Sequence, residues 1–224
     1  GERVMLFKIG VLIYGYFAGA LIQAGYWMGK FNKIDIRDYG SGNAGTTNVM
    51  RTLGKKAGIA TYLLDAFKAV IADILIHFLI VPHTAIPEML LFLYCGLGIV
   101  LGHNFPFYLK FKGGKGIAAS SGVVISLMIF PKYCFMFTVF GIFFFAFVAR
   151  ISRYVSLASL IGMAMFFVEF LIWGFLGWLP LNGTDLVEGT VIVFALAALA
   201  FIRHRSNIVR LVHGTERKIG EKKN

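Results

Sequence analysis

The chain has 224 residues, of which 58% are hydrophobic and only 15% are charged, and its mean hydropathy is +0.76. Soluble domains carry about 25% charged residues, so this composition excludes an ordinary soluble domain and predicts an all-α integral membrane protein. The net charge of +11 does not indicate a nucleic-acid partner. Lysine and arginine collect in the cytoplasmic loops of membrane proteins, and an excess of positive charge is expected there.

Apolar segments follow one another along the chain, and all but the two short halves of 117–149 are long enough to cross a bilayer. They cover residues 9–28, 57–81, 89–109, the two halves of 117–149, 155–178 and 186–202. The stretch 117–149 is too long for one span, and Pro131 favours a break within it. The sequence therefore predicts seven transmembrane helices in a single polytopic domain covering residues 1–224.

The basic residues predict the orientation of these helices. Of the 22 lysines and arginines, 18 lie in residues 30–56, 110–115, 150–153 and the tail from Arg203. By the positive-inside rule this side is cytoplasmic, with the N-terminus outside and the C-terminus inside. Three polar segments rich in glycine, amides and cations interrupt the apolar sequence, and all three fall on this side.

The first polar segment runs from Ser41 to Asn48. Gly42 and Gly45 permit positive φ angles and close backbone approach, so that successive N–H groups can converge on an anion. Arg51 adds a bidentate guanidinium for a phosphate. The neutral donors of the segment are Asn43, Thr46, Thr47 and Asn48. The alternative interpretation is an ordinary capped helix start after a loop.

The second polar segment begins at Gly102-His103-Asn104-Phe105-Pro106 and ends at Gly113-Gly114-Lys115-Gly116. It is not a nucleotide P-loop, because a glycine rather than a serine or threonine follows Lys115. Lys112 and Lys115 flank Gly113 and Gly114, which suits a single phosphate at the start of the next helix. The alternative is a basic cluster that only stops translocation.

The third polar segment starts at Arg203 and reaches Glu216. His204 and Asn207 are three residues apart, so a helix would place them on one face. A juxtamembrane arginine cluster alone signals only topology; the added histidine, asparagine and glutamate favour a functional segment.

Together the three segments resemble one known family. SGNAGTTNVMRTLG at 41–54, GHNFPFYLKFKGGKGIA at 102–118 and RHRSNIVRLVHGTE at 203–216 are similar in order and spacing to the motifs of the bacterial acyl-phosphate:glycerol-3-phosphate acyltransferases. One departure is Ala119, where a hydroxyl residue is expected; Ser120 is adjacent. The resemblance implies an enzyme of phospholipid synthesis in the bacterial cytoplasmic membrane, with its active site on the cytoplasmic side.

The resemblance also implies the reaction and its participants. An acyl group would move from acyl phosphate to the 1-hydroxyl of glycerol 3-phosphate, giving lysophosphatidic acid and phosphate. No metal or cofactor is expected. Membrane lipids surround the enzyme, and a synthase that supplies acyl phosphate is an expected partner.

Each polar segment then receives a role. Ser41, Asn43 and His204 are the expected catalytic residues. The expected substrate-binding residues are Gly42, Gly45, Thr47, Asn48, Arg51, Lys112, Gly113, Gly114, Lys115, Asn207 and Glu216. The base that takes the hydroxyl proton stays open between His204 and a substrate phosphate, and Ser41 as a covalent nucleophile is a third route.

Charged residues within the apolar segments need a separate explanation. Asp65 and Lys68 are three residues apart, which predicts an ion pair that supports the first polar segment. Two other functions are consistent with a basic membrane protein: a transporter for phosphorylated small molecules, and a scaffold with a lipid-binding face. The position of the polar segments at one membrane edge disfavours transport.

Overall fold

The structure is a computed structural model that describes residues 1–221, and within these residues every regular element is a helix. The chain divides into two compact units, Gly1–Leu127 and Met128 onward. Helices suit lipid because each satisfies its own backbone hydrogen bonds.

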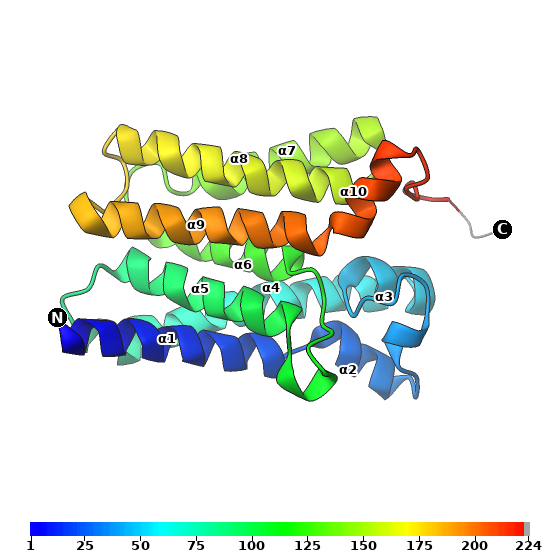
Figure 1. The fold of residues 1–224 in the computed structure, drawn as a ribbon, viewed down its shortest axis with the longest axis horizontal. Coiled ribbons are helices and arrows are strands. Elements are labelled where there is room, and N and C mark those ends of the chain that lie inside the picture. The colour runs from blue at the N-terminus through cyan, green and yellow to red at the C-terminus, as the bar shows by residue number, and fades with distance from the viewer. Residues whose placement is uncertain (222–224) are drawn as a thin grey trace. The chain divides into compact units, whose positions relative to one another are not determined.

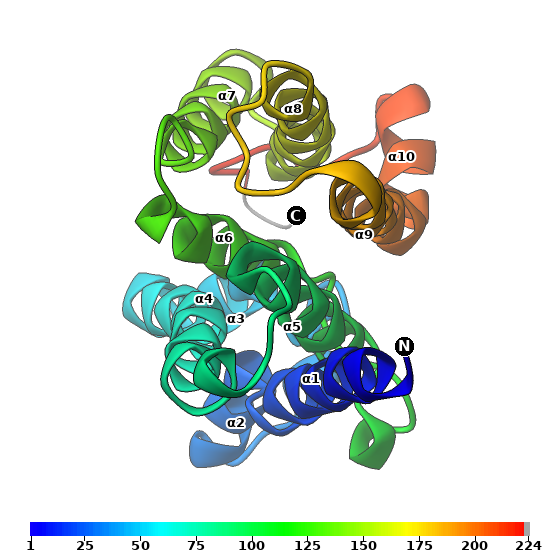
Figure 2. The ribbon, with the colours of Figure 1, turned by 90° about the vertical axis from the view of Figure 1, so that its left-hand side faces the viewer.

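Unit 1 holds the first two polar segments, and unit 2 holds the third. The elements of unit 1 are α1 (Glu2–Leu21), α2 (Ala24–Phe31), η1 (Ile36–Asp38), α3 (Thr46–Leu53), α4 (Lys55–Leu79), η2 (Val81–His83), α5 (Glu88–Asn104), η3 (Phe107–Leu109) and α6 (Ile117–Ser126). Helix α5 is the most buried of them and packs against α1, α4 and α6, as the nearly end-on view of Figure 2 shows.

Helices α1 and α5 approach each other closely because each carries two glycines four residues apart at the contact. A Cβ atom on Gly15 or Gly19 of α1 would lie within 2.3 Å of the carbonyl oxygens of Cys95 and Ile99. Gly98 and Gly102 of α5 approach the α1 backbone in the same way, with 2.0 Å from a Cβ on Gly102 to the carbonyl oxygen of Tyr16. Small residues at this spacing are the usual means by which membrane helices pack backbone to backbone.

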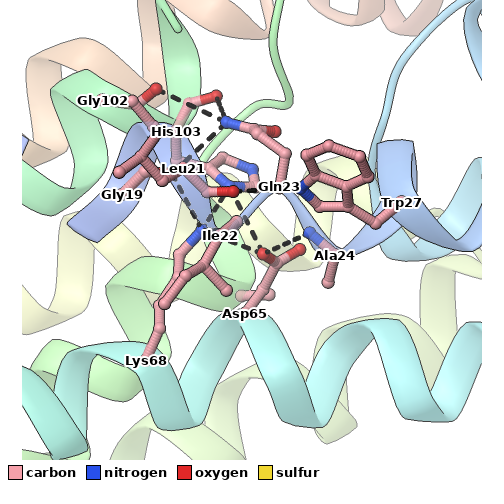
Figure 3. A network of polar contacts seen from close by, with 12 residues as sticks. Gly19, Leu21, Ile22, Gln23, Ala24, Trp27, Asp65, Lys68, Gly102 and His103 are labelled. Carbon is pink, nitrogen blue, oxygen red and sulfur yellow. Dashed lines mark hydrogen bonds and ion pairs between the residues drawn. The ribbon is translucent and has the colours of Figure 1, made fainter. Parts of the chain in front are cut away.

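The first apolar run differs from the expected single span 9–28. Helix α1 ends at Leu21, Ile22 and Gln23 are not helical, and α2 begins at Ala24. A break would leave the last carbonyl groups of α1 without partners. Here three side chains donate hydrogen bonds to these carbonyl groups. The Lys68 ammonium donates to the carbonyls of Gly19 and Ile22. The Tyr108 hydroxyl donates to the Ala20 carbonyl, and the Trp27 indole donates to the Leu21 carbonyl. The break is therefore stabilised by side chains, most of them far away in sequence (Figure 3).

Unit 2 is built on three long helices. Its elements are η4 (Leu127–Ile129), which begins at the last residue of unit 1, α7 (Met136–Ser152), α8 (Val155–Phe175), α9 (Gly183–Arg203) and α10 (Arg205–Val212). Aromatic rings fill the contact between α7 and α8. The ring centroid of Phe137 lies 5.5 Å from that of Phe166 and 6.2 Å from that of Phe170. Helix α10 continues from α9 after a turn at His204 and packs on both α8 and α9 (Figure 1).

The predicted break near Pro131 is present, because α6 with η4 ends at Ile129 and α7 starts at Met136. Within residues 1–221, four segments are long and apolar enough to cross a membrane: Glu2–Phe31, Glu88–Leu109, Val155–Phe175 and Gly183–Arg203. The apolar stretches Ile117–Ile129 and Met136–Ser152 are shorter. Helix α4 has 25 residues but buries Asp65, Lys68 and Asp73. The count of seven spans stays a prediction.

Candidate functional site

The first polar segment is folded around the side chain of Asn48, which is 1% exposed. Its amide nitrogen donates to the carbonyls of Ile36, Tyr39 and Asn43 at 2.9–3.0 Å. Its amide oxygen accepts from the backbone N–H of Ser41 at 3.0 Å. Both ends of the amide therefore hold the loop, and Asn48 shapes the segment from within.

The glycines of this loop have different tasks. Gly40 and Gly42 adopt positive φ angles of 59° and 71°, where glycine carries no steric cost. Gly45 does not follow the expectation of positive φ: at φ −117° it is the extended N-cap of α3. The first N–H groups of α3, at Thr46 and Thr47, have no intrahelical acceptor by helix geometry and can point at an anion.

Ser41 and Asn43 contact each other at the exposed surface of the loop. The Asn43 amide donates to the Ser41 hydroxyl oxygen at 3.3 Å and to the Ser41 carbonyl at 3.2 Å. An amide N–H cannot take a proton from a hydroxyl, so this contact does not activate Ser41 as a nucleophile. It presents two neutral polar groups side by side. Arg51 lies exposed on α3, one turn beyond Thr47.

The second polar segment is closed back onto the end of α5. The N–H groups of Gly113 and Gly114 donate to the carbonyls of Asn104 and His103 at 3.2 and 3.1 Å. These two N–H groups therefore build the turn. The groups that can face an anion are the exposed Lys112, the half-buried Lys115 and the start of α6. Helix α6 begins after Gly116, which has a φ of 86°.

Beneath this turn lies a buried polar cluster that we call the α1-break cluster: Gln23, Asp65, Lys68 and His103, each 3% exposed or less. The Lys68 ammonium lies 2.9 Å from Asp65 Oδ1 and 2.9 Å from His103 Nδ1. The predicted Asp65–Lys68 ion pair is confirmed. It contacts the α1–α2 break and the second polar segment rather than residues 41–48 (Figure 3).

The first two polar segments lie at the same end of unit 1, away from the chain N-terminus (Figure 1). Arg37, in the loop that precedes the first segment, contacts the second, because its guanidinium donates to the Leu109 carbonyl at 3.3 Å. Asp35 holds this guanidinium at 2.7 Å. The hydrogen bond from Arg37 lowers the pKa of Asp35 to about 2, so the pair is charged at neutral pH.

In unit 2, the third polar segment places His204 at the turn between α9 and α10 and Asn207 in the first turn of α10, and both side chains are buried. His204 Nδ1 lies 2.7 Å from the Ala200 carbonyl. A carbonyl only accepts, so the proton of the neutral ring is on Nδ1 and the lone pair is on Nε2. This tautomer suits a proton acceptor.

Glu216 ties the segment after α10 back to the helices. Its carboxylate accepts from the Asn207 amide at 2.6 Å, from the Ser156 hydroxyl at 2.7 Å and from Arg210 Nε at 2.7 Å. Burial raises the pKa of Glu216, but these three hydrogen bonds outweigh it and leave the pKa below its ordinary value. Glu216 thus fixes the position of the Asn207 amide.

Comparison with known proteins decides the family. Residues 9–214 match the family described as glycerol-3-phosphate acyltransferase. The chain is 39% identical to the glycerol-3-phosphate acyltransferase of Thermoanaerobacter pseudethanolicus over 97% of this chain and 98% of that one. It is also 39% identical to the enzyme of the same name from Streptococcus pneumoniae strain Taiwan19F-14, over 94% and 92% of the two chains.

The chain belongs to the glycerol-3-phosphate acyltransferase family. Two solved structures agree. The crystal structure of PlsY (YgiH), an integral membrane glycerol 3-phosphate acyltransferase, in its glycerol 3-phosphate form has a TM-score of 0.79 at 31% identity and covers 95% of this chain and 96% of that one. Its lysophosphatidic acid form has a TM-score of 0.77 at 30% identity and covers 95% of each chain. This is accordingly an integral membrane acyltransferase of phospholipid biosynthesis.

Sequence reasoning gave no role to two residues of this acyltransferase that shape the site. Gln23 donates to the His103 carbonyl at 2.8 Å, and the His103 ring lies against Gly114. The signal for Gln23 was its position as a lone amide within an apolar run. His103 stood within the second polar segment, but the buried lysine that contacts it comes from a different helix. Among residues 1–221 no group of three or more histidine, cysteine, aspartate or glutamate residues is placed to hold a metal ion.

Proposed function

We propose that this chain transfers a fatty acyl group from acyl phosphate to the 1-hydroxyl of glycerol 3-phosphate, releasing lysophosphatidic acid and inorganic phosphate. The observation that supports it most is the likeness, over 95% of the chain, to PlsY structures in a glycerol 3-phosphate form and a lysophosphatidic acid form. Those are the acceptor and the acylated product of this reaction.

The chemistry requires anion binding more than nucleophile activation. An acyl phosphate is a mixed anhydride: the hydroxyl oxygen attacks the acyl carbon, the bond between that carbon and the phosphate oxygen breaks, and phosphate leaves with the electron pair. A site that holds two phosphates and the developing oxyanion supplies most of the stabilisation.

The first two polar segments supply groups of this kind. Ser41, Gly42, Asn43, Gly45 and the first turn of α3 with Thr47 would hold the acyl phosphate and the oxyanion, in a loop shaped by Asn48. Arg51, Lys112 and Lys115 would bind phosphate charge, with the Gly113–Gly114 turn setting the place of the two lysines.

The third polar segment would position the acceptor. His204 would take the hydroxyl proton through Nε2, because its Nδ1 proton is directed to the Ala200 carbonyl. Asn207 would contact glycerol 3-phosphate from the place in which Glu216 holds it. A substrate phosphate is the alternative proton acceptor. An acyl-enzyme on Ser41 is disfavoured by its contact with the Asn43 amide.

The proposal includes seven spans, with all three polar segments on the cytoplasmic side of the bacterial membrane, the N-terminus outside and the C-terminus inside. The charge distribution supports it, since 18 of 22 lysines and arginines fall in that set of loops and the tail. Acyl phosphate would come from a synthase on the same side.

A donor comparison tests the reaction. Purified protein in liposomes receives labelled glycerol 3-phosphate with acyl phosphate, acyl-CoA or acyl carrier protein of the same chain length. We expect labelled lysophosphatidic acid with acyl phosphate alone. Product with either thioester and none with acyl phosphate would refute the proposed donor. Labelled glycerol 3-phosphate that enters the liposomes unchanged would indicate the transporter function instead.

A further inference from the structure

Lys68 is the centre of the α1-break cluster, and four acceptors surround its ammonium. They are the carbonyls of Ile22 at 2.6 Å and Gly19 at 3.3 Å, Asp65 Oδ1 at 2.9 Å and His103 Nδ1 at 2.9 Å. The side chains of Lys68 and Asp65 are each 1% exposed. Burying a charge this deeply is costly, so a buried ion pair inside a membrane protein points to a specific task.

This surrounding fixes the state of the His103 ring. A lysine ammonium has three hydrogens and no lone pair, so it only donates. His103 Nδ1 lies 2.9 Å from this ammonium and 3.6 Å from Asp65 Oδ1, so it is placed to accept from Lys68 rather than to donate to Asp65. In that arrangement the proton of the neutral ring is on Nε2.

The other edge of the His103 ring lies against the glycine turn of the second polar segment. A Cβ atom added to Gly114 would lie 2.2 Å from His103 Nε2, so the ring fills the place where that side chain would stand. The backbone of His103 is held as well, because its carbonyl accepts from the Gly114 N–H at 3.1 Å and from the Gln23 amide at 2.8 Å.

We propose that Lys68, held by Asp65, is a positioning residue for the acceptor phosphate: it fixes the tautomer and the orientation of His103 and, through that ring, the place of the Gly113–Gly114 turn and of Lys112 and Lys115. The inference rests on the proposed function, in which this turn and its two lysines bind substrate phosphate, and it assigns to them the phosphate of glycerol 3-phosphate. Lys68 touches no substrate; it acts through His103.

The direct test compares two buried lysines of unit 1. Lys68→Met removes the contact to His103, and Lys8→Met is the matched control, because Lys8 is 8% exposed and contacts the Tyr94 ring of α5. We expect Lys68→Met to raise KM for glycerol 3-phosphate by about 10- to 100-fold, the size of effect that small misplacements cause. KM for acyl phosphate should change less than about twofold, because the cluster does not contact residues 41–48. Lys8→Met should leave both KM values unchanged.

A second pair of variants keeps the test sharp if Lys68→Met is not recovered folded in detergent. His103→Gln introduces an amide whose oxygen can accept from Lys68 and whose nitrogen can donate, as the two ring nitrogens of His103 do. His103→Phe keeps only the ring shape. We expect the KM for glycerol 3-phosphate to be lower for His103→Gln than for His103→Phe, although the two variants have equal melting temperatures. A purely structural role would instead make KM follow thermal stability in all the variants.

The outcomes separate the inference from the function on which it rests. If the wild-type protein makes no lysophosphatidic acid from acyl phosphate, the proposed function fails. If the wild type is active and folded Lys68→Met has an unchanged KM for glycerol 3-phosphate, or if both KM values rise together, the positioning role fails while the proposed function stands.

Discussion

The ammonium of Lys68 lies 2.9 Å from Nδ1 of His103, although the two residues are 35 positions apart and belong to different helices. The same ammonium donates hydrogen bonds to two carbonyl groups at the end of α1. One buried cation therefore joins a helix break to the turn that carries Lys112 and Lys115. Lys68, a charge within an apolar helix, thus has partners at the end of α1, on α5 and on its own helix.

The close packing of α1 and α5 predicts a large effect of a small substitution. Gly102→Val should destabilise the protein by about 1–3 kcal/mol, because the added side chain meets the α1 backbone rather than a flexible side chain. Gly10→Ala is the control, since nothing lies within 4 Å of its Cβ position. Thermal unfolding in detergent measures both. Equal melting temperatures would show that the two helices do not pack as tightly as described.

We expect Asn48 to stabilise the conformation of the first polar segment rather than to bind one substrate. Asn48→Ala leaves the carbonyls of Ile36, Tyr39 and Asn43 without their donor, at a cost of about 1–3 kcal/mol for an unsatisfied buried polar group. We expect activity to fall sharply and trypsin to cleave more rapidly after Arg37. Asn32→Ala is the control, because the exposed Asn32 amide bonds only locally, to the Met28 carbonyl. An inactive Asn48→Ala with unchanged cleavage would favour direct substrate contact.

His204 offers a matched pair for proton transfer. The Nδ1 atoms of His204 and His213 each lie 2.7 Å from the carbonyl oxygen of the residue four positions earlier, but of the two rings only that of His204 is buried. We expect His204→Ala to lower kcat by about 10²–10⁴-fold, the usual contribution of a general base, and His213→Ala to have little effect. Wild-type kcat in folded His204→Ala would eliminate this ring as the base and favour a substrate phosphate.

Glu216 predicts a dependence of stability on pH. Its pKa is lowered in the folded protein, so its contribution is present above the unfolded value of 4.5 and is lost as pH falls through the lowered folded value. Glu216→Gln should reduce the melting temperature at neutral pH, and the difference from wild type should shrink below about pH 4.5.

The control for this prediction is Thr215→Ala, which leaves the carboxylate and its three donors in place. Thr215 is exposed, and its hydroxyl makes one long hydrogen bond of 3.4 Å to the Arg210 carbonyl. A difference between wild type and Glu216→Gln that stays constant from pH 7 to pH 4 would contradict the assigned pKa direction.

Much of this architecture was predictable from the composition of the chain and from its proline and glycine residues. Apolar length predicted most of the long helices, and Pro131 predicted the break between α6 and α7. Gly42 was expected to permit a positive φ angle, which it adopts, and the family motifs predicted the function class. These features are local: each depends on a few neighbouring residues and on the lipid that surrounds them.

The remaining features depend on contacts between segments that are distant in sequence. Nothing local to Ile22 and Gln23 ends a helix there; the break exists because Lys68 and Trp27 satisfy the carbonyls that it exposes. Gly113 and Gly114 looked like anion donors, yet their N–H groups close the loop onto α5. Asn48 was expected to be one of the donors to a bound anion, but its amide is buried and donates to carbonyls of its own loop.

Simultaneous measurement of both products tests the proposed acyl transfer most directly. Purified protein in liposomes is given acyl phosphate, and lysophosphatidic acid and inorganic phosphate are counted with and without glycerol 3-phosphate. We expect one phosphate for each lysophosphatidic acid, and release of neither without glycerol 3-phosphate. Phosphate release that does not depend on glycerol 3-phosphate, or lysophosphatidic acid formed without phosphate, would contradict it.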